Sequence, residues 1–144
     1  MMIGKVKSVS RFPKYILSNC PDVTAARRKT DEEAYFIFYN RDNKIIGATA
    51  ISYNTYSISK LGLPEWEIFI ESFEVYRKYR GQGYGGEMLK WIEENLPIRK
   101  IELCHRIEED DNSASRLFWE KHGFTKPRPD YQEMEKYETK EDRA

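Results

Sequence analysis

Residues 66–97 read WEIFIESFEVYRKYRGQGYGGEMLKWIEENLP, and this stretch decides the fold. It begins with alternating apolar and polar residues, which is typical of a β-strand with one buried face. Four glycines follow within six positions. The stretch then carries an apolar residue at every fourth position: Tyr84, Met88, Ile92 and Leu96. This repeat predicts a helix that ends at Pro97, so a strand, a glycine loop and a helix are expected in succession.

The apolar residues of the strand change phase partway along it. They occupy even-numbered positions first and odd-numbered positions afterwards: Trp66, Ile68 and Ile70, then Phe73 and Val75. Because side chains alternate strictly between the two faces of a strand, we expect one extra residue, a β-bulge, around Glu71 and Ser72. A strand buried on both faces is the alternative interpretation.

Upstream of this stretch, the pattern predicts a short strand and a hairpin. We expect a strand over Ile3–Val9 and helical turns around Phe12–Ser18 and after Pro21. The segments 33–40 and 44–53 are rich in β-branched and aromatic residues and enclose a turn-like RDNK sequence. That arrangement is typical of a β-hairpin.

Downstream, the segment KIELC at 100–104 predicts another strand. We expect the next helix to begin at Asn112 and to end before Gly123. The residues expected on its inward face are Ala114, Leu117 and Phe118. Phe124 and the segment 131–137 predict two closing strands. The elements together predict one mixed α/β domain over residues 1–137, followed by a charged tail at 138–144.

The composition limits the classes of function. The 144 residues include 24 Lys+Arg and 24 Asp+Glu, so the formal net charge is zero and a general nucleic-acid binder is not expected. Cys20 and Cys104 lie in no metal-binding spacing, and we expect no metal. No apolar run approaches the roughly 18 residues of a membrane span, so we expect no membrane partner and a cytoplasmic location.

The sequence RGQGYGG, residues 80–86, is the stretch most suggestive of chemistry. Glycines between a strand and a helix allow close approach of a ligand, and the exposed N–H groups and the helix dipole favour an anion. A simple turn whose glycines serve only packing is the structural alternative. A phosphate-binding P-loop is excluded, because Glu87-Met88 stands where that motif has Lys-Ser/Thr.

A dinucleotide-binding fingerprint is a second alternative. The pattern GxGxxG is matched by Gly81, Gly83 and Gly86, and Glu102 lies near the expected acidic position. However, the motif comes after the midpoint of the chain, which leaves too few residues for the rest of a doubly wound sheet. The preceding strand also contains Glu71 and Glu74, whereas such folds use a buried apolar strand there.

Taken as R-x-x-G-x-G, residues 80–85 resemble the acetyl-CoA motif of the GNAT superfamily of N-acetyltransferases. The segment 112–124, NSASRLFWEKHGF, is similar to the later N-x-x-A…L-Y-x-K-x-G-F helix of that family, and YQEMEK is similar to its closing strand. The resemblance runs over roughly Trp66 to Tyr137. It implies a mixed, mostly antiparallel central sheet, splayed after a bulged fourth strand and flanked by helices.

The resemblance also implies the residues that bind the co-substrate acetyl-CoA. Backbone N–H groups of the loop would hold the pyrophosphate, the backbone of Phe73 and Val75 would pair with pantetheine, and the Val75 N–H would polarise the thioester carbonyl. Asn112 would touch the pantetheine or cap its helix. The residues so implied are Phe73, Val75, Arg80, Gly81, Gln82, Gly83, Tyr84, Gly85, Gly86 and Asn112.

The implied reaction is direct attack of an amine on the acetyl thioester. An amine with a pKa of about 10.4 costs roughly 4.6 kcal/mol to deprotonate at pH 7, so a carboxylate base is expected. Glu71 is the first candidate because it stands at the bulge, and Glu67 on the same strand is the second. Trp119 occupies the position of the family's tyrosine acid, and Tyr84 or Tyr131 are candidate substitutes.

The expected function is therefore N-acetyl transfer to a primary amine of a small molecule or a peptide. The sequence does not identify the acceptor, and it leaves room for a homodimer. A non-catalytic acyl-CoA-binding or interaction module on the same fold is the alternative that the missing tyrosine favours. An NAD-type dinucleotide-binding protein is the third interpretation.

Overall fold

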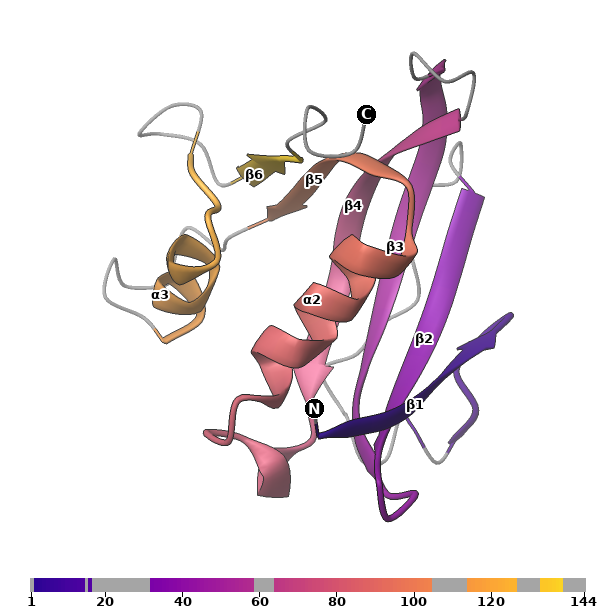
Figure 1. Cartoon of the computed structure of the whole chain (residues 1–144), viewed down its shortest axis with the longest axis vertical. Coiled ribbons are helices and arrows are strands. Elements are labelled where there is room, and N and C mark those ends of the chain that lie inside the picture. Colours follow the sequence, from indigo (N-terminus) through magenta and orange to yellow (C-terminus); the bar gives the residue numbers. More distant parts are fainter. Residues whose placement is uncertain are drawn as a thin grey trace.

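The computed structural model describes residues 2–14, 16, 32–58, 64–104, 114–126 and 133–138. Within these ranges, six strands form one sheet in the order β1-β2-β3-β4-β5-β6 (Figure 1). Their bounds are β1 Ile3–Val9, β2 Glu32–Asn40, β3 Ile45–Ile58, β4 Pro64–Val75, β5 Ile98–Cys104 and β6 Glu133–Tyr137. Among these described strands, only the β4–β5 pair is parallel. The mixed, mostly antiparallel sheet expected from the sequence is confirmed.

The helical segments whose bounds the structure describes are η1 Arg77–Tyr79, α2 Tyr84–Asn95 and α3 Ala114–Lys121. Helix α2 lies across one face of the sheet (Figure 1) and buries the side chains Tyr84, Met88, Leu89 and Ile92. They share a core with β4 and β5 residues such as Ile68, Ile70 and Ile101. The predicted four-residue repeat is confirmed, and the helix ends before Pro97 as expected.

Helix α2 is also bonded to both edge strands of the sheet. The Glu87 carboxylate accepts hydrogen bonds from the backbone N–H groups of Met2 and Ile3, at 2.8 and 3.2 Å. Glu93, two turns later, forms an ion pair with Lys136 of β6 at 2.8 Å. The helix therefore contacts the first and the last strand of the sheet through charged side chains.

The hairpin and the β-bulge lie where the sequence predicts them. In the β2–β3 turn, the Asn40 side chain accepts hydrogen bonds from the backbone N–H groups of Asp42 and Lys44. In the β3–β4 pair, Ser72 lies opposite Ala50 while Ile70 lies opposite the next residue, Ile51. Glu71 is the extra residue of the bulge.

The sheet opens after this bulge. The parallel pairing of β4 with β5 begins at Trp66 and ends where Ile70 meets Leu103. Phe73 and Val75 lie beyond this pairing, although they remain paired with β3. The expected splay after a bulged fourth strand is confirmed.

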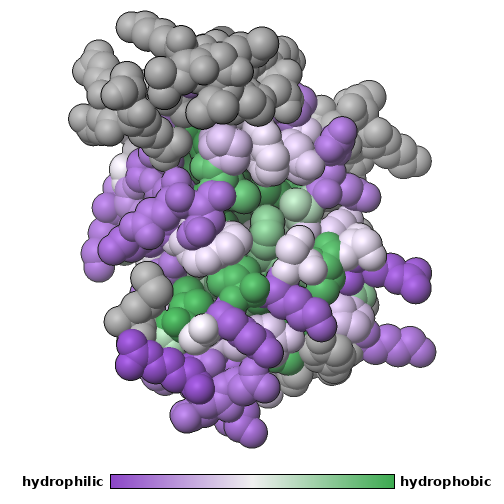
Figure 2. All heavy atoms as spheres, turned by 45° about the vertical axis from the view of Figure 1, so that its right-hand side comes forward, coloured by the Kyte–Doolittle hydropathy of each residue, from purple (hydrophilic) through white to green (hydrophobic). Residues whose placement is uncertain are grey.

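A smaller apolar cluster covers the opposite face of β1–β3. It comprises Ile16, Ile37, Tyr39 and Ala48, and the fully buried Ile16 donates its N–H to the Pro13 carbonyl at 3.0 Å. Of the helical turns expected at Phe12–Ser18, the described residues Lys14 and Ile16 are helical, whereas the turn expected after Pro21 lies outside the described residues. On the face shown in Figure 2, hydrophilic side chains dominate among the coloured residues and apolar ones gather in the middle of the view, in agreement with the 33% charged residues.

Two expectations about the C-terminal part were wrong. Leu117 does not face inward: it is 51% exposed, and Trp119, only 7% exposed, takes the inward position of α3. Contacts with α2 and β4 turn the face bearing Phe118, Trp119 and His122 toward the protein. The strand expected at Phe124 is reduced to one bridge between Thr125 and Glu135. The chain turns sharply just before it, at Gly123 with φ +92°.

Candidate active site

The glycine loop leaves a row of backbone N–H groups at the start of α2. Gly81 and Gly83 have φ values of +76° and +89°, a conformation that other residues adopt only under strain. Gly83 is the N-cap and provides no side-chain cap, and the first helical bond runs from the Glu87 N–H to the Gly83 carbonyl at 3.3 Å. The N–H groups of residues 84–86 therefore have no partner within the helix. Such a row, at the positive end of a helix dipole, suits an anion.

The other two glycines serve packing between helices. A Cβ atom on Gly85 would lie 3.1 Å from Phe118 Cε1, and one on Gly86 would lie 3.2 Å from His122 Cε1. Their missing side chains let α3 approach α2 closely. Burial and the neighbouring Lys121 and Lys136 lower the pKa of His122, which favours its neutral form beside the loop. From the sequence, all four glycines were assigned to a ligand loop, with packing as the alternative; at Gly85 and Gly86 the structure shows packing contacts.

Arg80 fixes the entrance of the loop to the end of β4. Its Nε donates to the Val75 carbonyl and its Nη2 donates to Glu74 Oε1, both at 2.9 Å. Glu74 is only 7% exposed, whereas Arg80 is 48% exposed. Two residues after Arg80, the Gln82 side-chain Nε2 donates to the Lys78 carbonyl at 3.4 Å. The pairing of Glu74 with Arg80 was not predicted, because nothing in the pattern of the strand indicates that this glutamate is buried.

Because of the register of β4 with β3, the backbone N–H and C=O groups of two β4 residues point into the opening of the sheet. The Tyr76 N–H donates to the Ile46 carbonyl at 2.6 Å, which makes this a hydrogen-bonded pair. Because antiparallel pairs alternate, the backbone groups of Val75 and Phe73 point away from β3, toward the opening. Above them, the Phe73 ring packs edge-on against Trp119, with centroids 5.1 Å apart.

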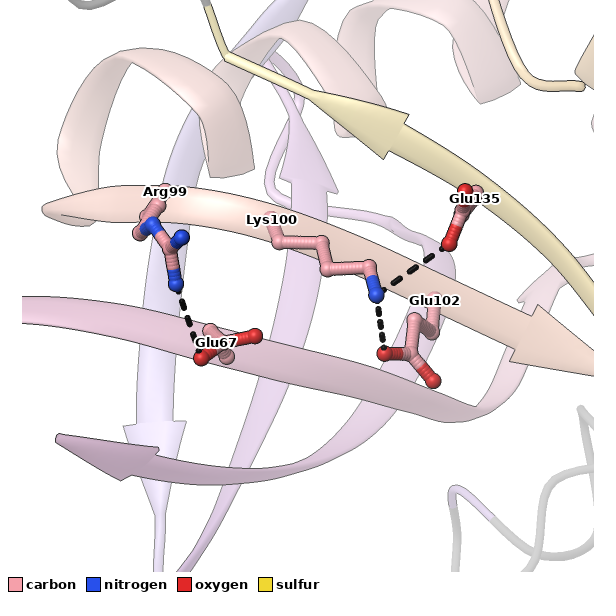
Figure 3. A network of polar contacts seen from close by, with 5 residues as sticks. All are labelled: Glu67, Arg99, Lys100, Glu102 and Glu135. Atoms are coloured by element: carbon pink, nitrogen blue, oxygen red, sulfur yellow. Dashed lines mark hydrogen bonds and ion pairs between the residues drawn. The ribbon is translucent and has the colours of Figure 1, made fainter. Parts of the chain in front are cut away.

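The two candidate bases differ in their partners. Half-buried Glu71 accepts a hydrogen bond from the hydroxyl of the fully buried Ser52, at 3.2 Å. Glu67 forms an ion pair with Arg99 at 3.2 Å (Figure 3). Ser52 belongs to the face of β3 opposite α2, because its neighbour Ile51 lies in the core beneath that helix. The Glu71 carboxylate thus lies on the face of the sheet away from the glycine loop.

Glu102, the acidic residue of the dinucleotide alternative, lies within a charged network of β5 and β6. Lys100 Nζ is 3.0 Å from Glu102 and 3.1 Å from Glu135 (Figure 3). Burial alone lowers the pKa of Lys100, but hydrogen bonds to these two carboxylates raise it above its ordinary value. Glu102 also lies opposite Phe69, before the sheet opens. The network joins two strands and is separate from the glycine loop.

The remaining candidate residues are Tyr84, Asn112 and Tyr131. Tyr84, proposed as a substitute acid, is 8% exposed and packs its ring against Tyr79, with centroids 5.7 Å apart. Asn112 and Tyr131 lie outside the described residues.

Within the described ranges, no group of three or more His, Cys, Asp or Glu residues is arranged to hold a metal ion. In that same part of the chain, no helix is long and apolar enough to cross a membrane.

Residues 8–124 match the family model of the acetyltransferase (GNAT) family, and the chain belongs to this family. The glycine loop, the bulged strand and the opening beside it are thus parts of an acetyltransferase fold. A comparison with curated protein sequences gives no significant match.

Solved structures with the same fold include plant and bacterial acetyltransferases. Arabidopsis thaliana NAA60, in complex with a bisubstrate analogue, is 10% identical with a TM-score of 0.62, over 94% of this chain and 100% of that one. Arabidopsis thaliana Naa50, in complex with the bisubstrate analogue CoA-Ac-MVNAL, is 17% identical with a TM-score of 0.54, over 92% and 99%. A putative acetyltransferase from Bacteroides thetaiotaomicron is 19% identical with a TM-score of 0.56, over 88% and 80%. The chain spans 64% of the length of another matching structure, a mutant of the BH1408 protein from Bacillus halodurans.

Proposed function

We propose that this protein transfers the acetyl group of acetyl-CoA directly to a primary amine. One observation carries the proposal: the row of free helix N–H groups at residues 84–86 stands beside the opening where β4 parts from β5. An elongated ligand with an anionic middle and a thioester end matches both features. Membership of the acetyltransferase family supports the same conclusion.

The residues present fit coenzyme A. Without side chains at Gly81 and Gly83, the loop is open, since an added Cβ would meet nothing within 4 Å at Gly81 and only Met2 Cε, at 3.8 Å, at Gly83. The amides of residues 82–86 would hold the pyrophosphate, with Arg80 at the entrance. The backbone of Phe73 and Val75 would pair with pantetheine, and the Val75 N–H would donate to the thioester oxygen. Acetyl-CoA supplies the acetyl group in activated form.

Glu71 is the proposed general base. The Ser52 hydroxyl fixes one of its carboxylate oxygens, and the bulge places Glu71 at the point where the sheet begins to open. An acceptor approaching from the face opposite α2 would meet this carboxylate, which would remove a proton from the ammonium group. Glu67 is the weaker candidate because Arg99 already neutralises it.

The thiolate would leave without a tyrosine acid at position 119. Trp119 is buried between Phe73 and Phe124, and its indole N–H is not an acid. A leaving thiol with a pKa of about 8.5 departs as a thiolate far more readily than an alkoxide does. The aromatic contacts therefore give Trp119 a packing role beside the opening.

A peptide N-terminus is the acceptor to test first, together with small-molecule amines. The peptide in the CoA-Ac-MVNAL complex of Naa50 supports this choice, because that protein shares the fold over nearly its whole length. The half-buried Glu71 facing away from the glycine loop is compatible with either kind of acceptor.

A thermal shift assay followed by an amine panel tests the proposal. Coenzyme A and acetyl-CoA should raise the melting temperature, while NAD should not. Acetyl transfer to peptides or amines should then be detected as release of free thiol. Stabilisation by coenzyme A without transfer to any amine would favour the alternative, a non-catalytic acyl-CoA-binding module, which the tryptophan at position 119 supports. Stabilisation by NAD alone would refute both.

A further inference from the structure

Arg80 forms two hydrogen bonds within the protein through two of its five guanidinium donors. Nε donates to the carbonyl of Val75, and Nη2 donates to the carboxylate of Glu74. The two acceptors are consecutive residues at the end of β4, whereas Arg80 directly precedes the glycine loop. The guanidinium thus joins the end of the strand to the start of the loop.

The burial of Glu74 makes this pair unlike an ordinary surface ion pair. Its side chain is 7% exposed, so the carboxylate is removed from water and depends on charged and polar partners within the protein. A buried ion pair rarely stabilises a fold more than apolar residues of similar volume would. Its distinctive contribution is geometric, because a planar guanidinium fixes both acceptors in direction as well as distance.

Val75 connects the pair to the proposed reaction. Its N–H and C=O both point into the opening of the sheet, because Tyr76 pairs with Ile46 and Val75 is the adjacent, non-hydrogen-bonded position. Arg80 binds the carbonyl at 2.9 Å. The Val75 N–H is the other backbone polar group on that side. It belongs to the peptide unit between Glu74 and Val75, and Arg80 binds both of these residues, through the Glu74 carboxylate and the Val75 carbonyl.

We propose that Arg80, fixed by buried Glu74, is a positioning residue that sets the separation between the Val75 N–H and the amides of residues 82–86. This inference rests on the proposed function, in which those groups bind the two ends of the pantetheine arm. In this proposal Arg80 acts through Val75 and the loop backbone and not through a contact with the phosphates. Its main effect is on turnover, because it sets where the thioester lies at the Val75 N–H while the loop amides themselves hold the pyrophosphate.

Two substitutions test the contacts of Arg80, one at the arginine itself and one at its partner Glu74. Arg80→Lys keeps the positive charge at an exposed position but loses the planar pair of donors, and Glu74→Gln removes the charge that orients Arg80. Arg77→Lys is the matched control, since Arg77 is an exposed arginine one turn earlier. The measurements are the affinity for coenzyme A by titration calorimetry, and kcat and KM for acetyl transfer.

We expect both variants to bind coenzyme A within about twofold of the wild type and to lose about 10- to 100-fold in kcat, the loss typical of small misplacements. The double variant should be no slower than the slower single variant, because both break one unit. A contact between Arg80 and phosphate would instead weaken the binding of coenzyme A in Arg80→Lys and leave kcat and Glu74→Gln unaffected. That result overturns the inference.

Amide hydrogen exchange in the free protein tests the connection without any ligand. Both variants should exchange faster than the wild type at residues 75 and 81–86, while Arg77→Lys should not. Unchanged exchange in both variants would refute the inference even if the enzyme is active. A wild-type protein that binds no coenzyme A would refute the proposed function, and the exchange data would still decide whether Arg80 orders the loop.

Discussion

The Ser52 hydroxyl donates a hydrogen bond to Glu71 Oε1 across the β3–β4 pair, at 3.2 Å. Ser52 is fully buried, whereas Glu71 is the extra residue of the bulge. A fixed serine thus orients a carboxylate on a strand that is irregular at that point. This relationship distinguishes Glu71 from the other acidic residues of β4.

Glu71→Gln should lower turnover by about 10²–10⁴-fold at neutral pH, because the amide keeps the shape and accepts the Ser52 hydrogen bond but cannot take a proton. The affinity for coenzyme A should be nearly unchanged. The loss should shrink as the pH rises toward the pKa of the acceptor amine. Steady-state kinetics between pH 7 and pH 10 measures this dependence.

Glu67→Gln is the matched control on the same strand. It should retain most of the activity, because Glu67 is engaged with Arg99. The assignment of the base would be wrong if Glu67→Gln were the slower variant. A loss in Glu71→Gln of the same factor at every pH would indicate that Glu71 positions the substrate.

Gly83→Asp should strongly weaken the binding of coenzyme A, whereas Gly83→Asn should retain much of it. Both side chains tolerate a positive φ comparably, and an added Cβ at this site meets only Met2 Cε at 3.8 Å. The variants therefore differ mainly in charge, and a negative charge about 4 Å from a phosphate costs roughly 1–4 kcal/mol. Titration calorimetry with coenzyme A measures the difference. Equal affinities for the two variants would place the anion elsewhere.

Gly85→Ala should destabilise the fold by about 1–3 kcal/mol, because its Cβ would lie 3.1 Å from Phe118 and push α3 away. Phe118→Leu in the same chain should recover part of the loss. Gly81→Ala is the control: its Cβ meets no atom within 4 Å, so its cost comes from its positive φ and Phe118→Leu should not relieve it. Urea unfolding of the four variants measures these free energies. Equal rescue of both alanine variants would contradict the packing role.

His122 should make the protein less stable as the pH falls below about 6.5, the ordinary pKa of histidine. Burial, Lys121 and Lys136 lower its pKa in the folded state, while Glu93 opposes them. The unfolded chain therefore binds the proton more tightly, so the stabilisation is complete above the unfolded pKa and is lost as the pH falls through the folded one. Urea unfolding at pH 7.5 and pH 5.5 should show a smaller decrease for His122→Gln than for the wild type. An identical decrease would assign the effect to other groups.

The sequence predicted the features that depend on local periodicity. The phase change from Ile70 to Phe73 located the bulge, and the four-residue repeat from Tyr84 located α2. Both signals come from one face of one element, so neighbouring residues suffice to reveal them. The glycine loop between them was predicted for the same reason.

Contacts between distant segments were not predictable. Leu117 was expected inside because it is apolar. The missing side chains of Gly85 and Gly86 let the face of α3 that bears Phe118 and His122 pack against α2, and Leu117 is exposed on another face. The pair of Glu74 and Arg80 was missed because strand periodicity does not indicate whether a charged residue finds a buried partner. The roles of the site residues stay predictions until the variants above are measured.

The bonds of α2 to both edge strands have a consequence for how the protein is made. Glu87 reaches back 85 positions to Met2, and Glu93 reaches forward 43 positions to Lys136. Helix α2, which begins at the loop amides, can therefore form both of these contacts only after β6 has been synthesised. Contacts between residues far apart in the sequence slow folding. Deleting either edge strand should accordingly impair the distant loop, although neither strand belongs to it.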